Sequence, residues 1–341
     1  AAGNRLDAAG AAAFSERPLA PAAELRVALD SISMRCGPRV EGLFTSPIDP
    51  AFDRNNCSMI RAQEPVQLLM RWPDGMWLAR TRYAMGWIAS DAALSPALGP
   101  AERDLVVGPA PMRAPSGLTL TSADGARVSL SHDTLLSVDP RDGSALFADA
   151  SGLHRGSPAR LQPTARALTR RAVLEEAFTR LGDPYGWGGQ AGGLDCSSFV
   201  MDVLGTFGLE LPRHSGRQAD SGAYTVSLEE TPDPRERERL IDASARQGIV
   251  LLHFPGHIML YLGRDASGTP MVIHAFSEYM EPCSAAGASE DDETLRRVDR
   301  VAVSDLSLGR GSSRRSFLER VDRLVVFGQR QDRGLEPPDD A

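Results

Sequence analysis

The stretch from Gly182 to Gln218 decides how the rest of the chain is interpreted. It begins Gly182-Asp-Pro-Tyr185-Gly-Trp187-Gly-Gly-Gln-Ala-Gly-Gly-Leu-Asp195-Cys196-Ser197-Ser-Phe-Val-Met-Asp-Val-Leu and ends Leu-Pro-Arg-His-Ser215-Gly-Arg-Gln218. Apolar residues recur at helical spacing after the cysteine, which predicts a helix with one buried face. A glycine-rich loop therefore delivers Cys196 to the first turn of a helix that Asp195 or Ser197 can cap.

Cys196 is the predicted nucleophile of this stretch. The positive end of the helix dipole favours the thiolate, which is the nucleophilic form of cysteine. The alternative is a buried structural cysteine. The loop before Cys196 contains two aromatic residues and many glycines, which packing of a structural cysteine would not require. This composition favours the functional interpretation.

Composition excludes several classes of protein. The chain has 341 residues, of which 42% are hydrophobic and 24% charged, as expected for a globular protein of two or three domains. A net charge of −8 and the lack of a basic tract argue against nucleic acid. No apolar run is long enough to span a membrane, and no Cys-x-x-Cys spacing supports a metal, so no cofactor is expected.

The first half of the chain is predicted to be rich in short strands. Residues 1–57 are interpreted as a partly helical N-terminal extension that packs on the other domains, with a helix over Ala22–Ile32. Strands and tight turns over 58–98 predict a small β-barrel, and residues 99–160 a second one with its first strand at Leu105–Val107.

The second half has an α+β pattern, with a catalytic domain over 161–330 and a tail over 331–341. Thr169 is expected to cap a helix that ends at Gly182, ahead of the cysteine helix. Residues 225–247 are interpreted as an insertion with a helix over Glu236–Ser244, and 278–315 as a polar excursion. The strands are expected at Ile249–Leu252, Ile258–Leu262, Met271–Ile273 and Leu324–Phe327.

Two of the six histidines are placed to act with the cysteine. His257 begins one predicted strand and His274 ends the next, so neighbouring strands can bring the two side chains together. His257 would then share a proton with Cys196, and His274 would fix its tautomer. His214 could touch substrate, whereas structural or surface roles are expected for the remaining three: His132, His154 and His253.

These motifs, together with Gly-His257-Ile-Met-Leu-Tyr-Leu-Gly and Val-Ile-His274-Ala, resemble the NlpC-type cysteine peptidases of bacterial cell walls. The resemblance covers Thr169–Phe276 and the strand at 324–327. It implies a papain-like α+β fold with a Cys196–His257–His274 triad. It also implies that the hydroxyl of Tyr185 assists the Cys196 backbone amide in stabilising the oxyanion.

The Gly-Trp-Ile sequence at 86–88 is similar to the SH3-like modules found in such proteins. The combination resembles the subgroup that cleaves γ-D-glutamyl–diamino acid bonds. That resemblance implies that Asp195 and Ser197, with Tyr83 and Glu64 from the first barrel, bind the free amino end of the substrate. The helix-capping role of Asp195 and a solvated surface role of Glu64 are the alternatives. Two further residues of the matching motifs complete the predicted substrate-binding set: Trp187 and Ser215.

We therefore predict a monomeric cysteine endopeptidase that hydrolyses γ-D-glutamyl–diamino acid bonds in peptidoglycan peptides with a free N-terminal L-Ala. An amidase or acyltransferase that uses the same thiol, and a non-catalytic cell-wall binding protein, are the alternatives. We expect a periplasmic or secreted protein whose signal peptide is not part of this chain. The diamino acid, the roles of the insertions at 225–247 and 278–322 and of Cys283, and the pairing of Cys36 with Cys57 stay open.

Overall fold

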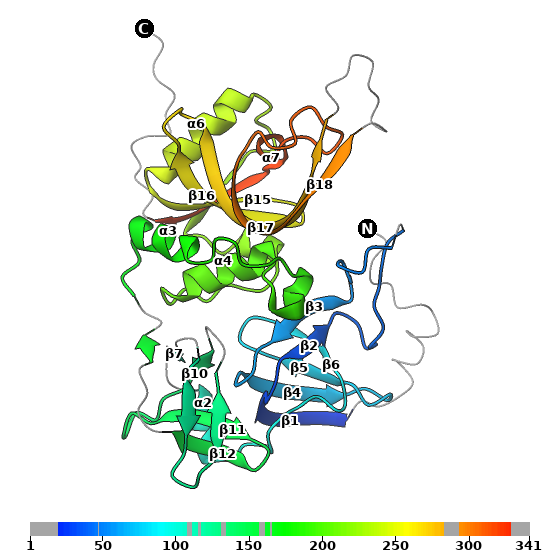
Figure 1. Cartoon of the computed structure of the whole chain (residues 1–341), viewed down its shortest axis with the longest axis vertical. Coiled ribbons are helices and arrows are strands. Elements are labelled where there is room, and N and C mark those ends of the chain that lie inside the picture. The colour runs from blue at the N-terminus through cyan, green and yellow to red at the C-terminus, as the bar shows by residue number, and fades with distance from the viewer. Residues whose placement is uncertain are drawn as a thin grey trace. The chain divides into compact units, whose positions relative to one another are not determined.

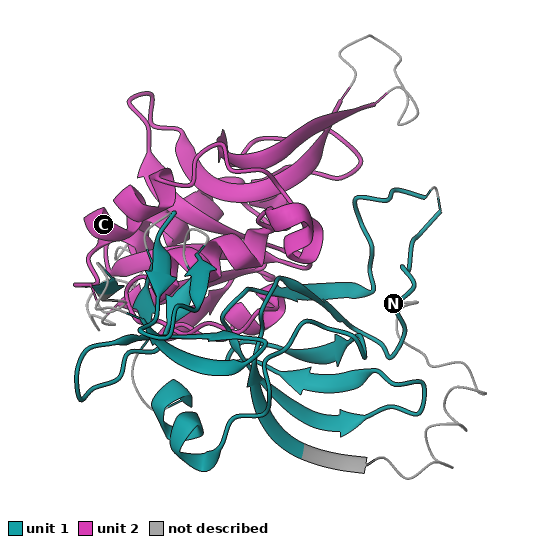
Figure 2. Cartoon of the chain, turned by 60° about the horizontal axis from the view of Figure 1, so that its bottom comes forward, with its two compact units in different colours: residues 1–165 teal, residues 166–341 magenta. Residues whose placement is uncertain are grey.

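The computed structural model describes residues 20–46, 48–107, 111–114, 117–130, 134–156, 161–163, 166–282 and 293–328. The chain divides into two compact units, residues 1–165 and residues 166–341 (Figure 2). Each unit buries its own apolar clusters, and each is described below by itself.

Unit 1 begins with a six-stranded antiparallel sheet. Its strands, in spatial order, are β1 (Ala20–Val27), β4 (Pro65–Arg71), β5 (Trp77–Arg80), β6 (Met85–Ile88), β2 (Ile32–Arg35) and β3 (Asn56–Ile60). Alternate residues of these strands form one buried cluster that includes Met34, Ile60 and Leu68. The described strands leave β1 and β3 as edges and form no closed barrel, so the pairing does not show the predicted SH3-like barrel.

The predicted helix over Ala22–Ile32 is wrong. Leu25 and Val27 lie in β1, where they pair with Gln67 and Pro65 of β4. Their spacing of two suits a strand as well as a helix, and pairing with a neighbouring strand decides the outcome. A disulfide joins Cys36 to Cys57, with the two Cα atoms 5.2 Å apart, and settles the pairing that the sequence left open.

The rest of unit 1 consists of one helix and short strands. They are α2 (Pro100–Val107), β7 (Met112–Arg113), β8 (Thr119–Thr121), β9 (Arg127–Ser129), β10 (Leu135–Leu136), β11 (Ala145–Asp149), β12 (Gly152–Gly156) and β13 (Gln162–Pro163). The described strands pair as β10-β7-β13, β11-β12 and β8-β9, and again no closed barrel forms. The predicted strand at 105–107 is wrong: those residues end α2, which has Pro100 at its first position and Glu102 in its first turn.

Unit 2 is built on a second six-stranded antiparallel sheet (Figure 1). Its order is β14 (Tyr224–Ser227), β19 (Arg323–Gly328), β15 (Gly248–Phe254), β16 (His257–Arg264), β17 (Pro270–Glu281) and β18 (Thr294–Asp305). The helices are α3 (Arg170–Phe178), the 3-10 helix η1 (Trp187–Gly192), α4 (Cys196–Gly205), α5 (Ser215–Gln218), α6 (Pro234–Ala245) and α7 (Phe317–Arg320). The α+β prediction for this half of the chain is confirmed.

The two faces of this sheet pack against different helices. Strand residues such as Leu251, Leu260 and Ile273 form one buried cluster with α3 and α4. Their immediate neighbours, among them Leu252, form another with α6 and α7. We call these the α4 face and the α7 face; Figure 1 shows α4 and α6 on opposite sides of the sheet.

The polar excursion predicted over 278–315 is only partly correct. β17 continues to Glu281, and β18 covers Thr294–Asp305. β18 is an edge strand whose first half is mostly exposed and arginine-rich, so its sequence shows no regular apolar alternation. Three earlier predictions fall outside the described residues: Cys283, His132 and the tail over 331–341.

Candidate active site

Glycine residues determine the backbone conformation of the loop before Cys196. Gly188 and Gly189 have φ of 63° and 86°, the left-handed region that glycine adopts without strain. Gly186 is required for a different reason, because a Cβ there would collide with the backbone oxygen of Gln190. The loop leads into α4, where Asp195 is the N-cap and forms a capping box with Ser198, as the sequence indicated.

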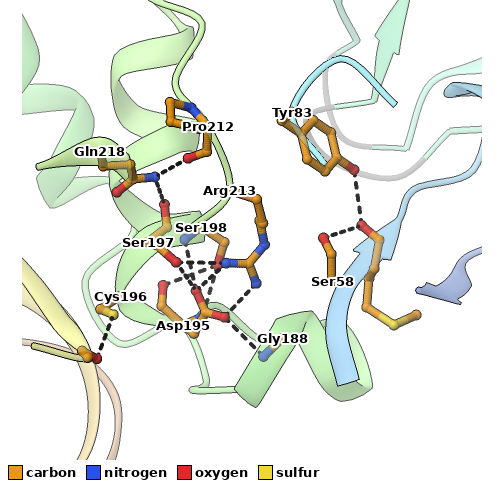
Figure 3. Close-up of polar contacts among 12 residues, drawn as sticks. Ser58, Tyr83, Gly188, Asp195, Cys196, Ser197, Ser198, Pro212, Arg213 and Gln218 are labelled. Carbon is orange, nitrogen blue, oxygen red and sulfur yellow. Dashed lines mark hydrogen bonds and ion pairs between the residues drawn. The ribbon is translucent and has the colours of Figure 1, made fainter. Parts of the chain in front are cut away.

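The carboxylate of Asp195 is the centre of a buried ionic network (Figure 3). Arg213 donates to it twice, at 2.8 Å to Oδ1 and 2.5 Å to Oδ2. Oδ1 also accepts from the hydroxyl of Ser197 at 3.0 Å and from the backbone N–H of Ser198 at 2.9 Å. Oδ2 accepts from the N–H of Gly188 at 3.0 Å. The carboxylate therefore accepts five hydrogen bonds, and the guanidinium of Arg213 neutralises its charge.

Burial alone would raise the pKa of Asp195. The charge of Arg213 and the hydrogen bonds to the carboxylate outweigh it, and the pKa of Asp195 lies below its usual value. The Asp195–Arg213 pair is thus fully ionised near neutral pH. Gln218, also buried, completes the framework by donating to the carbonyl oxygens of Ser197 and Pro212, both at 2.8 Å.

Cys196 is a free, buried thiol at the first position of α4. Burial raises its pKa to about 12, and the negative charge of Asp195 adds to the rise. The helix dipole is expected to favour the thiolate, and burial of the anion acts against it. Desolvation of the anion outweighs the dipole here, so Cys196 is a neutral thiol at pH 7.

The structure brings His257 and His274 together as predicted. Nε2 of His257 lies 2.7 Å from Nδ1 of His274, whose Nε2 lies 3.0 Å from the hydroxyl of Ser304. The rings pack among aromatic side chains of the α7 face, Phe276 and Phe317. Burial lowers the pKa of His257 to about 3, with the positive charge of Arg320 as the next cause.

The Cys196 thiol contacts the backbone of the turn between β15 and β16, which leads into His257. Pro255-Gly256 forms this two-residue turn, with Gly256 at φ 88°. Sγ of Cys196 lies 4.0 Å from the carbonyl oxygen of Gly256, and the backbone N–H of Ile258 faces the thiolate and favours it. The backbone on both sides of His257 thus contacts the thiol. No hydrogen bond between the Cys196 and His257 side chains is among those of the described residues.

The other predicted residues of unit 2 occupy varied positions. Burial raises the pKa of the Tyr185 hydroxyl, and the charge of a Cys196 thiolate is the next cause, which places the phenol near the thiol. Trp187 begins η1, and Ser215 is the buried first residue of α5. His253 is buried and paired with Asp322 at 2.9 Å, in agreement with its predicted structural role.

Glu64 and Tyr83 lie together in unit 1. The Tyr83 hydroxyl donates to Oε2 of Glu64 at 2.5 Å. It also lies 3.0 Å from the carbonyl oxygen of Met59, the contact of Tyr83 that Figure 3 draws. Glu64 is buried rather than solvated, and burial raises its pKa against the opposing effects of Arg61 and Tyr83. His154, predicted at the surface, is instead partly buried between Asp124 and Asp149.

Sequence reasoning missed four residues around the site. Arg213 and Gln218 stand in the quoted motif, but their partners there could not be deduced from it. Ser304 lies on β18, the strand that was not predicted. Arg320 lies at the end of α7, and no local motif indicates that it neighbours His257.

Among the described residues, no group of three or more His, Cys, Asp or Glu side chains is arranged to hold a metal ion. Within the same ranges, no helix combines the length and apolar character that crossing a bilayer requires.

A helix with cysteine at its first position, packed on an antiparallel sheet that presents paired histidines, defines a papain-like class of α+β domain. The model of the NlpC/P60 family matches residues 182–281, and this part of the chain is an NlpC/P60 domain. The resemblance to the NlpC-type peptidases is thereby confirmed, whereas the subgroup with SH3-like modules is not. Ser304 and Arg320 lie beyond the matched residues.

Solved structures support the same fold. An NlpC/P60 endopeptidase from Photobacterium damselae subsp. piscicida superposes with a TM-score of 0.71 at 15% identity, over 94% of this chain and 79% of that chain. An NlpC/P60 family protein from Bacillus cereus gives a TM-score of 0.54 at 14% identity, over 90% and 100%. At such identities the likeness concerns the fold alone.

Curated relatives are endopeptidases by name, and RipB is named a peptidoglycan endopeptidase. RipB of Mycobacterium tuberculosis is 28% identical over 156 residues, which is 36% of this chain and 58% of that protein. A probable endopeptidase of Mycobacterium bovis is 42% identical over 69 residues, or 20% of this chain and 18% of that protein. The chain thus spans between about a fifth and three fifths of the length of these relatives.

Proposed function

We propose that this protein is a cysteine endopeptidase that hydrolyses the γ-D-glutamyl–diamino acid bond of peptidoglycan peptides. The observation that carries the proposal is the His257–His274 pair, 2.7 Å apart, at the turn whose Gly256 carbonyl touches the Cys196 thiol. A nucleophile, a base and a group that orients the base are the minimum set for covalent catalysis by a thiol.

One arrangement of protons that fits these contacts leaves His257 able to act as a base. If Nε2 of His257 donates to Nδ1 of His274, then Nε2 of His274 donates to the hydroxyl of Ser304. Nδ1 of His257 is then unprotonated and free to act as a base. Because the thiol and the imidazole are both neutral at pH 7, the proton moves as the bond to substrate forms.

The proposed reaction has two steps. Sγ of Cys196 attacks the γ-carbonyl carbon while its proton passes to Nδ1 of His257. The Cys196 N–H and the Tyr185 hydroxyl stabilise the oxyanion. His257 then gives the proton to the leaving amine, and a thioester remains. In the second step water loses a proton to His257 and attacks the thioester, and the proton returns to the thiol as the γ-D-Glu product leaves.

Recognition of a free amino end is the second part of the proposal. Ser197, Glu64 and Tyr83 supply hydroxyl and carboxylate groups of the kind that bind an ammonium ion. Asp195 belongs to the proposed set, but Arg213 and three other groups already bond to its carboxylate. Asp195 therefore acts on the amine mainly through Ser197, whose hydroxyl it accepts from. Trp187 and Ser215 stay in the proposed set as residues that line the substrate.

The test is hydrolysis of L-Ala-γ-D-Glu-meso-diaminopimelate, followed by mass spectrometry. The N-acetylated peptide and the Cys196→Ala variant are run in parallel. We expect release of the diamino acid from the free peptide only, and a loss of about five to six orders of magnitude in kcat for the variant. Equal cleavage of the blocked peptide would keep the peptidase and reject recognition of the amine.

Failure to cleave either peptide would reject the proposal. Product formation only with an added amine or alcohol would then identify an acyltransferase. Thiol alkylation near neutral pH is a poor substitute for this test, because a buried thiol with a pKa near 12 reacts slowly even in an active enzyme. In the envelope, where the substrate is found, the Cys36–Cys57 disulfide would persist.

A further inference from the structure

Arg320 is a half-buried cation for which the described residues offer no anion. Its guanidinium carbon lies 4.0 Å from the centre of the Phe254 ring. No hydrogen bond or ion pair of its side chain is found within the described ranges. Other arginines nearby are paired: Arg296 with Glu281, and Arg314 with Glu278.

This cation lies beside the proposed base. Phe254, which it covers, pairs with His257 across the turn, and their ring centres are 5.1 Å apart. After burial, the charge of Arg320 is the largest cause that lowers the pKa of His257. The pKa of Arg320 is itself lowered, by burial and then by the charge of Arg314, and no carboxylate of the described residues is among the causes.

The segment that presents Arg320 is held firmly. Ser316 and Glu319 form a capping box at the start of α7, and Phe317 is buried. Arg237 of α6 donates to the carbonyl oxygens of Leu318 at 3.0 Å and Val321 at 2.5 Å, on either side of Arg320. The insertions at 225–247 and 278–322 thus pack on each other, and the position of Arg320 is fixed before substrate binds.

We propose that Arg320 binds a carboxylate on the leaving group of the substrate, namely the side-chain carboxylate of the diamino acid. The inference rests on the proposed function. The leaving amine takes its proton from His257, so the residue attached to that amine passes over this side of the site. A planar guanidinium already stacked on a ring is pre-organised to bind a carboxylate with two hydrogen bonds. The preferred substrates are therefore peptides of the diaminopimelate type rather than the lysine type.

The test uses three peptides that differ at one group. They are L-Ala-γ-D-Glu-X-amide, in which X is meso-diaminopimelate, its side-chain carboxamide or L-lysine. The α-carboxyl group is blocked in all three, so only the side-chain carboxylate varies. We compare kcat/KM for the natural protein, Arg320→Gln, Arg320→Lys and Arg310→Gln, which changes an exposed arginine of the same segment.

We expect the natural protein to prefer the carboxylate peptide by about 10- to 100-fold in kcat/KM. Arg320→Gln should reduce this preference to near one, Arg320→Lys should keep part of it, and Arg310→Gln should keep all of it. A shift in the pKa of His257 would change the three rates together, so the ratio isolates recognition. Equal rates in the natural protein, or a ratio unaffected by Arg320→Gln, would overturn the inference.

Calorimetric binding in a Cys196→Ala background separates this inference from the proposed function. If no peptide is hydrolysed, the endopeptidase proposal fails, but tighter binding of the carboxylate peptide that is lost in Cys196→Ala/Arg320→Gln still supports Arg320. If all peptides are hydrolysed and bind Cys196→Ala equally well, the endopeptidase stands and the role of Arg320 is rejected.

Discussion

The two faces of the sheet in unit 2 differ in whether their buried charge is compensated. On the α4 face, the Asp195 carboxylate is neutralised by Arg213 and accepts five hydrogen bonds. On the α7 face, two neutral imidazoles and the cation of Arg320 lie among aromatic rings, with no described carboxylate beside the guanidinium. The first face is electrostatically complete without a ligand, whereas the second lacks an anion.

This difference separates two tasks. A satisfied ion pair at the start of α4 fixes the loop and the thiol, and it is insensitive to what binds. An uncompensated cation near the base favours an anionic ligand, so the α7 face can select substrates. The position of the thiol would then depend on the α4 face and the specificity on the insertions, which include α7.

Removal of Arg213 should have the largest effect on stability. Arg213→Met leaves Asp195 buried and unpaired, and we expect a loss of about 3–5 kcal/mol in the free energy of unfolding of unit 2. The measurement is hydrogen exchange of the strand amides in β15 and β19. The matched control is Arg323→Met, which removes an exposed ion pair with Asp220 and should cost less than about 1 kcal/mol.

The stability lost in Arg213→Met should depend on pH. In the natural protein the pKa of Asp195 is lowered, so the pair stabilises the fold above the unfolded pKa, and this contribution is lost as the pH falls through the folded pKa. In Arg213→Met burial acts unopposed and raises that pKa. The gap between the two proteins should therefore narrow from pH 7 towards pH 4. A constant gap would show that Arg213 stabilises by packing, and Asp195→Asn/Arg213→Met should recover much of the loss.

Arg237 provides the corresponding test on the α7 face. Its guanidinium donates to four carbonyl oxygens and to no carboxylate: Leu228, Thr231, Leu318 and Val321. Arg237→Met leaves these acceptors without a donor, and we expect a loss of about 3 kcal/mol in unit 2 by hydrogen exchange. The preference for the carboxylate peptide should weaken as well, because α7 is no longer held.

The exposed Arg235, also on α6, is the control for this change. Arg235→Met should leave both stability and preference unaltered. If Arg237→Met destabilised unit 2 but left the peptide preference intact, Arg320 would not depend on α6 for its position.

The sequence predicted the cysteine helix and the histidine pair far better than the insertion residues that surround them. The cysteine helix, its Asp195 cap and the two histidines follow from local spacing, strand alternation and a family resemblance. Ser304 and Arg320 are brought to the site by β18 and α7, whose polar sequences lack a regular pattern of burial. In unit 1, Leu25 and Val27 fit a strand and a helix equally well, and only pairing with β4 decides between them.

The smallest expected effect concerns the far end of the histidine chain on the α7 face. Ser304→Ala removes the partner of Nε2 in His274, so the preferred tautomer of His274, and with it that of His257, is less well fixed. A loss of about 1 kcal/mol corresponds to about a fivefold fall in kcat, with KM and the carboxylate preference unchanged. Ser304→Thr keeps the hydroxyl and should restore the rate. An unchanged kcat in Ser304→Ala would show that Ser304 does not contribute to catalysis through His274. A changed preference for the carboxylate peptide would show that β18 supports Arg320 as well as His257.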